Sequence, residues 1–211
     1  IGGAFMSVYL DWAATAPPDP EILQGATRVA IESFGNPSSV HECGKIAALT
    51  LEDARSRAAA ALGVRPDSVF FTSGGTEADH IPLLSLIQRP NRGTIAISEI
   101  EHPAILEQAK MLECAGWKTV KIPADRDGFV TPDAVASSLR DDTALVAVMA
   151  VNNETGAIQP IGDIARRIKM VSVGRKKPHF HVDAVQAAGK VPLNITADGI
   201  DSAAISGHKI G

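Results

Sequence analysis

Segments with the patterns of strands and of helices alternate along most of this chain. We predict strands, most of them almost wholly apolar as in sheets buried on both faces, at 68–72, 94–97, 118–122, 144–151 and 178–182. We predict helices at 19–35, 44–62, 102–115, 132–139 and 160–170. This alternation predicts an α/β fold, in which a mostly parallel sheet is covered by helices on both faces.

Several residues mark where the helices begin and end. Asp19 can cap the first helix and Pro20 fits its first position, whereas Gly63 fits the left-handed end of the second helix. A further helix follows Gly75, and Pro82 lies in its interior. Proline there removes a backbone hydrogen bond at a cost of roughly 3 kcal/mol, so we expect a kink.

Composition narrows the class of protein. The 211 residues are 45% hydrophobic and 21% charged, with a formal net charge of −4. This balance is ordinary for a soluble globular protein and gives no reason to expect nucleic-acid binding. No apolar stretch is long enough to span a membrane and no signal peptide is apparent, and two cysteines make no disulfide framework. We therefore expect a cytoplasmic protein.

The domain organisation is simple. Residues 1–5 precede Met6 and look like the remnant of an expression tag, and residues 1–16 form an N-terminal segment. Residues 17–211 contain no repeat, linker or low-complexity tract and form one large domain.

Polar motifs follow the predicted strands, and parallel sheets bind ligands beyond the carboxyl ends of their strands. After the first strand comes Thr72-Ser-Gly-Gly-Thr-Glu77, where glycines at the start of a helix leave N–H groups free for a phosphate. Gly75 and the Thr76 hydroxyl are the candidate phosphate ligands, although most turns of this kind are only tight connections between a strand and a helix. The pattern does not match a nucleotide P-loop.

Two further motifs carry side chains suited to proton transfer or hydrogen bonding. His102 could stack on a planar ring and move protons near neutral pH, or it could be a solvent-facing residue at a helix start. Asn153 belongs to Asn152-Asn-Glu-Thr-Gly156, which fits either a self-satisfied turn or an amide that reaches a ligand.

The last two motifs suggest pyridoxal phosphate chemistry. Asp183, in a strand that should be buried, needs a cationic partner, and a pyridinium N–H would provide one, with Gln186 near the ring oxygen. Lys209 follows a strand of small residues and could form a Schiff base with the cofactor aldehyde. Ser206 and His208 beside it are candidate phosphate donors. A metal site at His179, His181 and Asp183 is the weaker alternative because a fourth ligand is lacking.

Together these motifs resemble the cysteine desulfurases of the NifS and IscS kind, in the class V group of fold-type-I pyridoxal phosphate enzymes. The resemblance runs from Val8-Tyr-Leu-Asp-Trp-Ala-Ala-Thr15 through Gly35-Asn-Pro-Ser-Ser-Val-His41 and the motifs above to Ser206-Gly-His-Lys209. It implies a homodimer whose large domain has seven strands, and a small domain built from the first residues and a C-terminal third. It also implies Lys209 as the Schiff-base lysine, His102 as the stacked acid or base, and Asp183 as the partner of the ring nitrogen.

The activity implied by this resemblance is the conversion of L-cysteine to L-alanine. In the family, a loop thiolate takes the sulfur as a persulfide and passes it to an iron–sulfur scaffold or another sulfur acceptor, including for thio-nucleoside synthesis. Neither Cys43 nor Cys114 matches that loop cysteine, so we expect a chain cut off after Lys209, without the small domain, and inactive alone. Selenocysteine lyase and a non-catalytic remnant that acts as a binding or dimerisation partner are the alternatives. His80 stands where the family usually has asparagine.

Overall fold

The computed structural model describes residues 8–211, so the expected tag remnant at 1–5 lies outside the described residues. Five strands form one parallel sheet in the order β2-β1-β3-β4-β5. Their bounds are β1 Thr94–Ser98, β2 Lys118–Ile122, β3 Thr143–Ala147, β4 His179–Asp183 and β5 Ser202–Ala204. The helices are α1 Pro20–Glu32, α2 Glu42–Leu62, α3 Gly75–Leu84, α4 Pro103–Cys114, α5 Pro132–Ser138 and α6 Ile161–Val171. Short 3₁₀ helices lie at Pro66–Ser68, Ser85–Gln88 and Gly207–Lys209.

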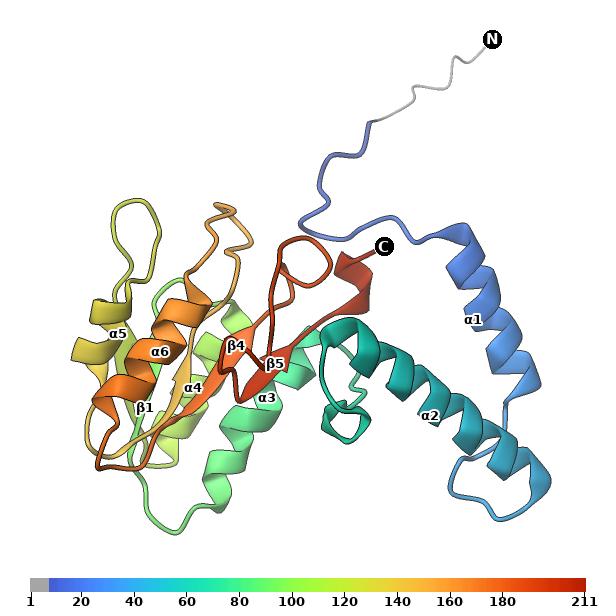
Figure 1. Ribbon diagram of the computed structural model, residues 1–211, viewed down its shortest axis with the longest axis horizontal. Coiled ribbons are helices and arrows are strands. Elements are labelled where there is room, and N and C mark those ends of the chain that lie inside the picture. Colours follow the sequence, from blue (N-terminus) through green and yellow to red (C-terminus); the bar gives the residue numbers. More distant parts are fainter. Residues whose placement is uncertain (1–7) are drawn as a thin grey trace.

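Helices cover the sheet on both faces, as the sequence predicts (Figure 1). On one face, α3 and α4 pack on β1 and β3 through buried residues that include Leu83, Ile105 and Leu145. On the other face, α5 and α6 pack on the same sheet through a second cluster that includes Ile164 and Phe180. Alternate residues of each strand thus point into one of two cores.

The predicted helix caps are confirmed. The Asp19 carboxylate accepts hydrogen bonds from the N–H groups of Glu21 and Ile22, and Gly63 ends α2 in the left-handed region with a φ of 65°. Pro82 lies inside α3, and the helix gives way to a 3₁₀ turn at Ser85, three residues later. Because Pro82 has no N–H, α3 lacks the hydrogen bond to Ala78 O, and the helix ends two residues later.

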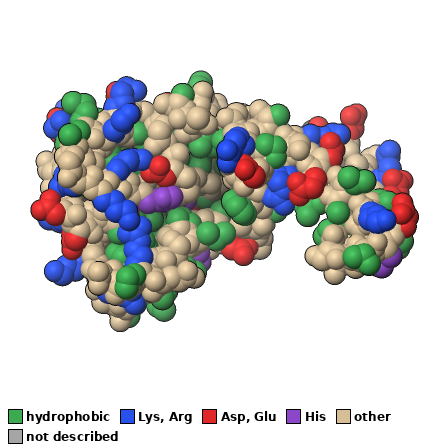
Figure 2. All heavy atoms as spheres, turned by 60° about the horizontal axis from the view of Figure 1, so that its bottom comes forward, with side chains coloured by type: hydrophobic (Ala, Val, Ile, Leu, Met, Phe, Trp, Pro, Cys, Tyr) green, Lys and Arg blue, Asp and Glu red, His purple; other side chains and the backbone are tan. Residues whose placement is uncertain are grey.

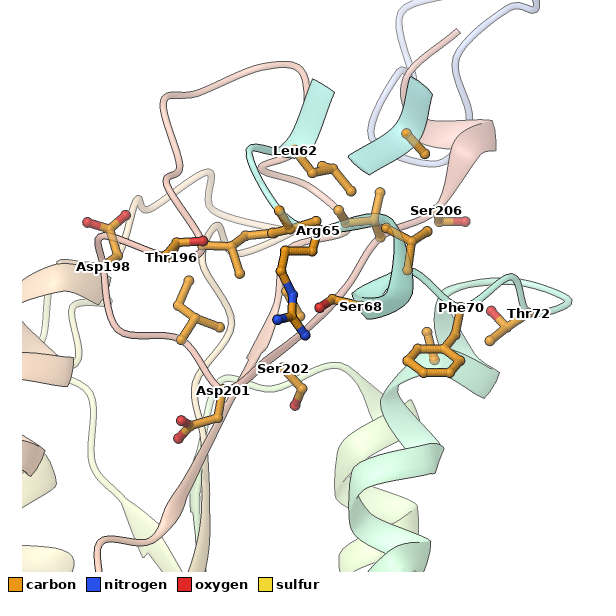
Figure 3. Close-up of a pocket in the computed structure, with 18 of the residues that line it drawn as sticks. Leu62, Arg65, Ser68, Phe70, Thr72, Thr196, Asp198, Asp201, Ser202 and Ser206 are labelled. Atoms are coloured by element: carbon orange, nitrogen blue, oxygen red, sulfur yellow. The ribbon is translucent and has the colours of Figure 1, made fainter. Parts of the chain in front are cut away.

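The strand predicted at 68–72 is wrong. Residues up to Ser68 form a 3₁₀ turn, and the extended residues that follow pair with no strand of the described chain. The side chains of Phe70 and Phe71 are 77% and 54% exposed. A hollow of about 1370 Å³, which we call the outer groove, separates this segment from the edge strand β5 (Figure 3). An apolar run forms a strand only where a neighbour supplies hydrogen bonds.

Helices α1 and α2 form an arm that extends away from the sheet (Figure 1). No residue of α1 is buried, and α2 buries only Gly44, Ala47 and Ala59. Figure 2 shows this arm as a lobe set apart from the body, with apolar side chains on its surface. No helix in residues 8–211 is long and apolar enough to cross a membrane.

Candidate functional site

A cavity of about 390 Å³ lies beyond the carboxyl ends of β1, β3, β4 and β5. All of the predicted site residues line it: Gly75, Thr76, His102, Asn153, Asp183, Gln186, Ser206, His208 and Lys209. They come together because parallel strands all end at the same edge of the sheet and the loops that follow them meet there.

The start of α3 forms one wall of this cavity. No side chain caps the helix at Gly74, so the first N–H groups of α3 keep their donor capacity. A Cβ atom on Gly75 would lie 2.7 Å from Cγ2 of Val185 and 3.4 Å from Cβ of Ser206, so only glycine fits. Ser206 Oγ lies 2.7 Å from His208 Nδ1. Free amides, a helix dipole and two polar side chains suit a phosphate group.

Asp183 ends β4 and is 5% exposed. Its Oδ1 accepts a hydrogen bond of 2.9 Å from the N–H of Val185, and no cationic side chain in residues 8–211 lies within ion-pairing distance. Burial, with a smaller effect from the nearby Asp79 carboxyl, raises the pKa of Asp183 to about 6. A buried acid without a cation fits a ligand that brings its own protonated nitrogen.

Lys209 lies in a short 3₁₀ helix rather than directly on a strand. Its Nζ donates hydrogen bonds to the carbonyl oxygens of Ala13, at 2.5 Å, and Ala14, at 2.7 Å. The Gln186 amide also donates to Ala13 O, at 2.8 Å. The amine is therefore held at the cavity wall by two backbone carbonyl oxygens, and it forms no ion pair with a carboxylate in residues 8–211.

His102 caps α4, and its Nδ1 accepts a hydrogen bond of 3.1 Å from the N–H of Ala104. A neutral ring must then carry its proton on Nε2. Glu101 beside it is fully buried: it accepts hydrogen bonds from the Ser98 hydroxyl and, at 2.7 Å, from Met149 N–H. Burial raises the pKa of Glu101 to about 8, and its hydrogen bonds join the end of β1 to Met149, beyond β3.

The two asparagines of the motif have different surroundings. Asn152 Oδ1 accepts hydrogen bonds from Glu154 N–H and from the N–H and hydroxyl of Thr155, which makes a self-satisfied turn. Asn153 lines the cavity. The three acidic and imidazole groups of β4 form no metal site, because no cluster of three or more such ligands is arranged around a common point in residues 8–211.

Sequence reasoning missed two parts of the cavity. Asp11, Ala13 and Ala14 close it from the N-terminal segment, and no strand or helix pattern marks them. Asp79 lines it from α3 and is 2% exposed. Asp79 lies one helical turn after Gly75, so both residues are on one face of α3. The sequence could therefore have predicted that Asp79 lines the same cavity.

The family model described as Aminotransferase class-V matches residues 8–211. The chain is 39% identical over 204 residues to "Cysteine desulfurase IscS" of Dictyoglomus turgidum, covering 96% of this chain and 50% of that protein. It is 40% identical over 205 residues to "Cysteine desulfurase NifS" of Azotobacter vinelandii, with the same coverage. The chain thus spans about half the length of these curated relatives.

Two solved structures that are similar to this chain have titles that point to the same kind of protein. A "NIFS-LIKE PROTEIN" matches with a TM-score of 0.89 and 38% identity, over 97% of this chain and 56% of that chain. The structure titled "SspA in complex with cysteine" matches with a TM-score of 0.88 and 28% identity, over 96% and 58% of the two chains.

Proposed function

The chain belongs to the class-V aminotransferase family, and from this premise we propose that the protein is a cysteine desulfurase that uses pyridoxal 5′-phosphate. One observation carries the proposal: a buried acid without a cation, Asp183, and a lysine amine, Lys209, line the same cavity. The relatives named cysteine desulfurases and the similar structure that holds cysteine favour this substrate over selenocysteine.

When bound, the cofactor supplies an aldehyde for amino groups and a protonated ring that withdraws electrons from the substrate α-carbon. Gly75, Thr76, Ser206 and His208 would hold its phosphate, through backbone N–H groups and side-chain donors. Asp183 would keep a proton on the ring nitrogen, and the Lys209 amine would bind the aldehyde.

The remaining residues would orient the substrate and move its protons. His102 would stack on the ring and exchange a proton at Nε2, because its Nδ1 is held by the helix cap. Asn153 and Gln186 would donate to the ring oxygen or to the substrate. No described cavity wall carries a thiol, since Cys43 and Cys114 are exposed elsewhere. The thiolate that accepts sulfur must therefore come from outside these walls.

Three further parts of the proposal concern organisation and location. Residues 17–211 form the large cofactor-binding domain, to which the N-terminal segment contributes one cavity wall.

The apolar side chains on α1, among them Ile22 and Ile31, are covered by a second copy in a homodimer. The protein acts in the cytoplasm, where its thiols stay reduced, and passes sulfur to an iron–sulfur scaffold or another acceptor protein.

The lysine assignment is tested by treating the chain with pyridoxal phosphate, reducing it with borohydride and mapping the labelled peptide by mass spectrometry. We expect the label on Lys209, its loss in Lys209→Ala, and no change in Lys176→Ala, which removes an exposed lysine. Equal labelling of all three proteins would contradict the assignment. Turnover of cysteine and selenocysteine by a full-length protein then separates desulfurase from lyase.

A further inference from the structure

Four polar side chains form a continuous hydrogen-bonded series behind the cavity. Asp79 Oδ1 lies 3.1 Å from His181 Nε2, and His181 Nδ1 lies 2.8 Å from Ser202 Oγ. Ser202 Oγ lies 2.7 Å from His179 Nε2. His181 is fully buried, so its two ring nitrogens have only these partners.

Two members of this series face different hollows. Asp79 lines the candidate cofactor cavity. Ser202 lines the outer groove, next to Asp201 (Figure 3), and His179 beside it is only half-buried. The series therefore connects the cavity with a second, open surface across the edge of the sheet.

Each interior member can both donate and accept, so the series has two complete arrangements. In the first, His179 Nε2–H donates to Ser202, the Ser202 hydroxyl donates to His181 Nδ1, and His181 Nε2–H donates to the Asp79 carboxylate. In the second, Asp79 is protonated and every bond is reversed. Neither arrangement leaves a buried polar atom of these four side chains without a partner.

We propose that His179, Ser202, His181 and Asp79 form a proton path between the surface beside the outer groove and the candidate cofactor cavity. A proton that binds Nδ1 of His179 releases the Nε2 proton to Ser202 Oγ. Ser202 passes its own proton to His181 Nδ1, and His181 passes its Nε2 proton to the Asp79 carboxylate. One proton enters and one carboxylate is neutralised, so charge and atoms balance.

The pKa values of Asp79 and His181 suit proton transfer along this path. Burial raises the pKa of Asp79 to about 7, so this carboxyl exchanges its proton near neutral pH. Burial lowers the pKa of His181 to about 4, so the ring passes a proton on without storing it. The other titratable groups that face the series are His80, His102, Glu101 and Asp183 near Asp79, and Lys177, Asp201 and Arg89 near His179.

The use of this path during turnover rests on the proposed function. A cofactor and substrate that fill the cavity exclude water, and a reaction that removes and returns protons then needs another route to solvent. Asp79 and His102 both line the cavity. A proton that reaches Asp79 along the path is thus delivered to the cavity in which His102 would exchange protons.

The test is ¹⁵N NMR of the cofactor-free chain with labelled histidines, which reports which nitrogen of His181 is protonated. As pH falls through about 7, we expect the His181 proton to move from Nε2 to Nδ1 while the ring stays neutral. Ser202→Thr keeps the hydroxyl and retains this change. Ser202→Ala removes the acceptor for Nδ1–H and abolishes it, and exchange of the His181 ring proton with water slows at least tenfold.

Asp79→Asn gives a second, independent measurement, because an amide cannot take up the proton. The pH dependence of the His181 tautomer should disappear in this variant. A tautomer that stays fixed in the wild-type chain, or that changes equally in Ser202→Ala or Asp79→Asn, would overturn the proposal. Since no cofactor or turnover is involved, failure here leaves the proposed desulfurase function untouched, and failure of that function leaves this result standing.

Discussion

At the residue scale, the candidate site is set by Asp183, a buried acid that no side chain of residues 8–211 neutralises. The Asp183 carboxyl is 5% exposed, and its hydrogen-bond donor is the backbone N–H of Val185. Such groups are costly in a folded chain and are retained where a ligand or a reaction uses them. A protonated nitrogen in the cavity would neutralise this acid.

The ionisation of Asp183 gives a prediction for the cofactor-free chain. Its pKa is raised from 3.8 to about 6, so its contribution to stability falls as pH rises from about 4 through 6 and stays low above. Asp183→Asn keeps the acceptor for Val185 N–H and should raise the free energy of unfolding at about pH 8 by roughly 2–3 kcal/mol, and by nearly nothing at about pH 4. Urea unfolding at both values measures this, with the exposed Asp127→Asn as the control. A gain that is equal at both pH values would contradict the assignment.

The close approach at Gly75 gives a second prediction. Gly75→Ala should lower the free energy of unfolding by roughly 1–3 kcal/mol, because the new methyl group meets Val185 at 2.7 Å. It should also weaken binding of pyridoxal phosphate, measured by fluorescence titration. Val185→Ala in the same chain should restore much of the lost stability. Gly25→Ala, where no atom lies within 4 Å, is the matched control and should cost nothing. Equal effects at the two glycines would rule out this account.

At the element scale, the sequence predicted the features that depend on neighbouring residues in the chain. Helix ends follow from Asp19, Pro20 and Gly63, which act through their own backbone or through neighbours one turn away. The placement of the site residues also followed from the sequence, since polar motifs after parallel strands meet at one edge.

What the sequence did not reveal depends on distant partners. The apolar run at 68–72 has the composition of a strand but no neighbour to pair with. The cavity wall at Ala13 and Ala14 depends on contacts with Lys209, which is almost two hundred residues away in the chain. The pairing of Asp79 with His181 likewise joins α3 to β4 and leaves no periodic signal.

The unpaired segment gives the third prediction. Phe70→Ser should change the free energy of unfolding by less than about 0.5 kcal/mol, because the side chain is largely exposed. It should also reduce binding of a hydrophobic dye to the outer groove. Leu86→Ala, at a fully buried position, should cost about 2–5 kcal/mol in the same unfolding assay. A large loss of stability on changing Phe70 would mean that this side chain is packed in solution.

At the scale of the whole molecule, the chain combines a well-packed parallel sheet with surfaces that its own residues leave open. The arm of α1 and α2 and the outer groove both expose apolar groups. The chain spans about half the length of its curated relatives. The cavity in the described residues holds candidate groups for cofactor binding but no thiol for accepting sulfur.

The lack of a thiol in the cavity of the described residues gives the fourth prediction. Supplied with pyridoxal phosphate and cysteine, the 211-residue chain alone should yield no sulfide or alanine above background, because Cys43 and Cys114 lie away from the cavity. Sulfide and alanine assays measure this, with a full-length desulfurase as the positive control. Robust turnover would show that one of these two thiols reaches the substrate.

The most direct measurement of the central claim is ¹⁵N NMR of pyridoxal phosphate labelled at the ring nitrogen and attached to the chain through Lys209. At about pH 8, where a free pyridine nitrogen is unprotonated, we predict a protonated ring nitrogen in the wild-type chain and in Asp127→Asn, and an unprotonated one in Asp183→Asn. The same nitrogen signal in all three proteins would contradict the claim that Asp183 and Lys209 act on opposite ends of one coenzyme.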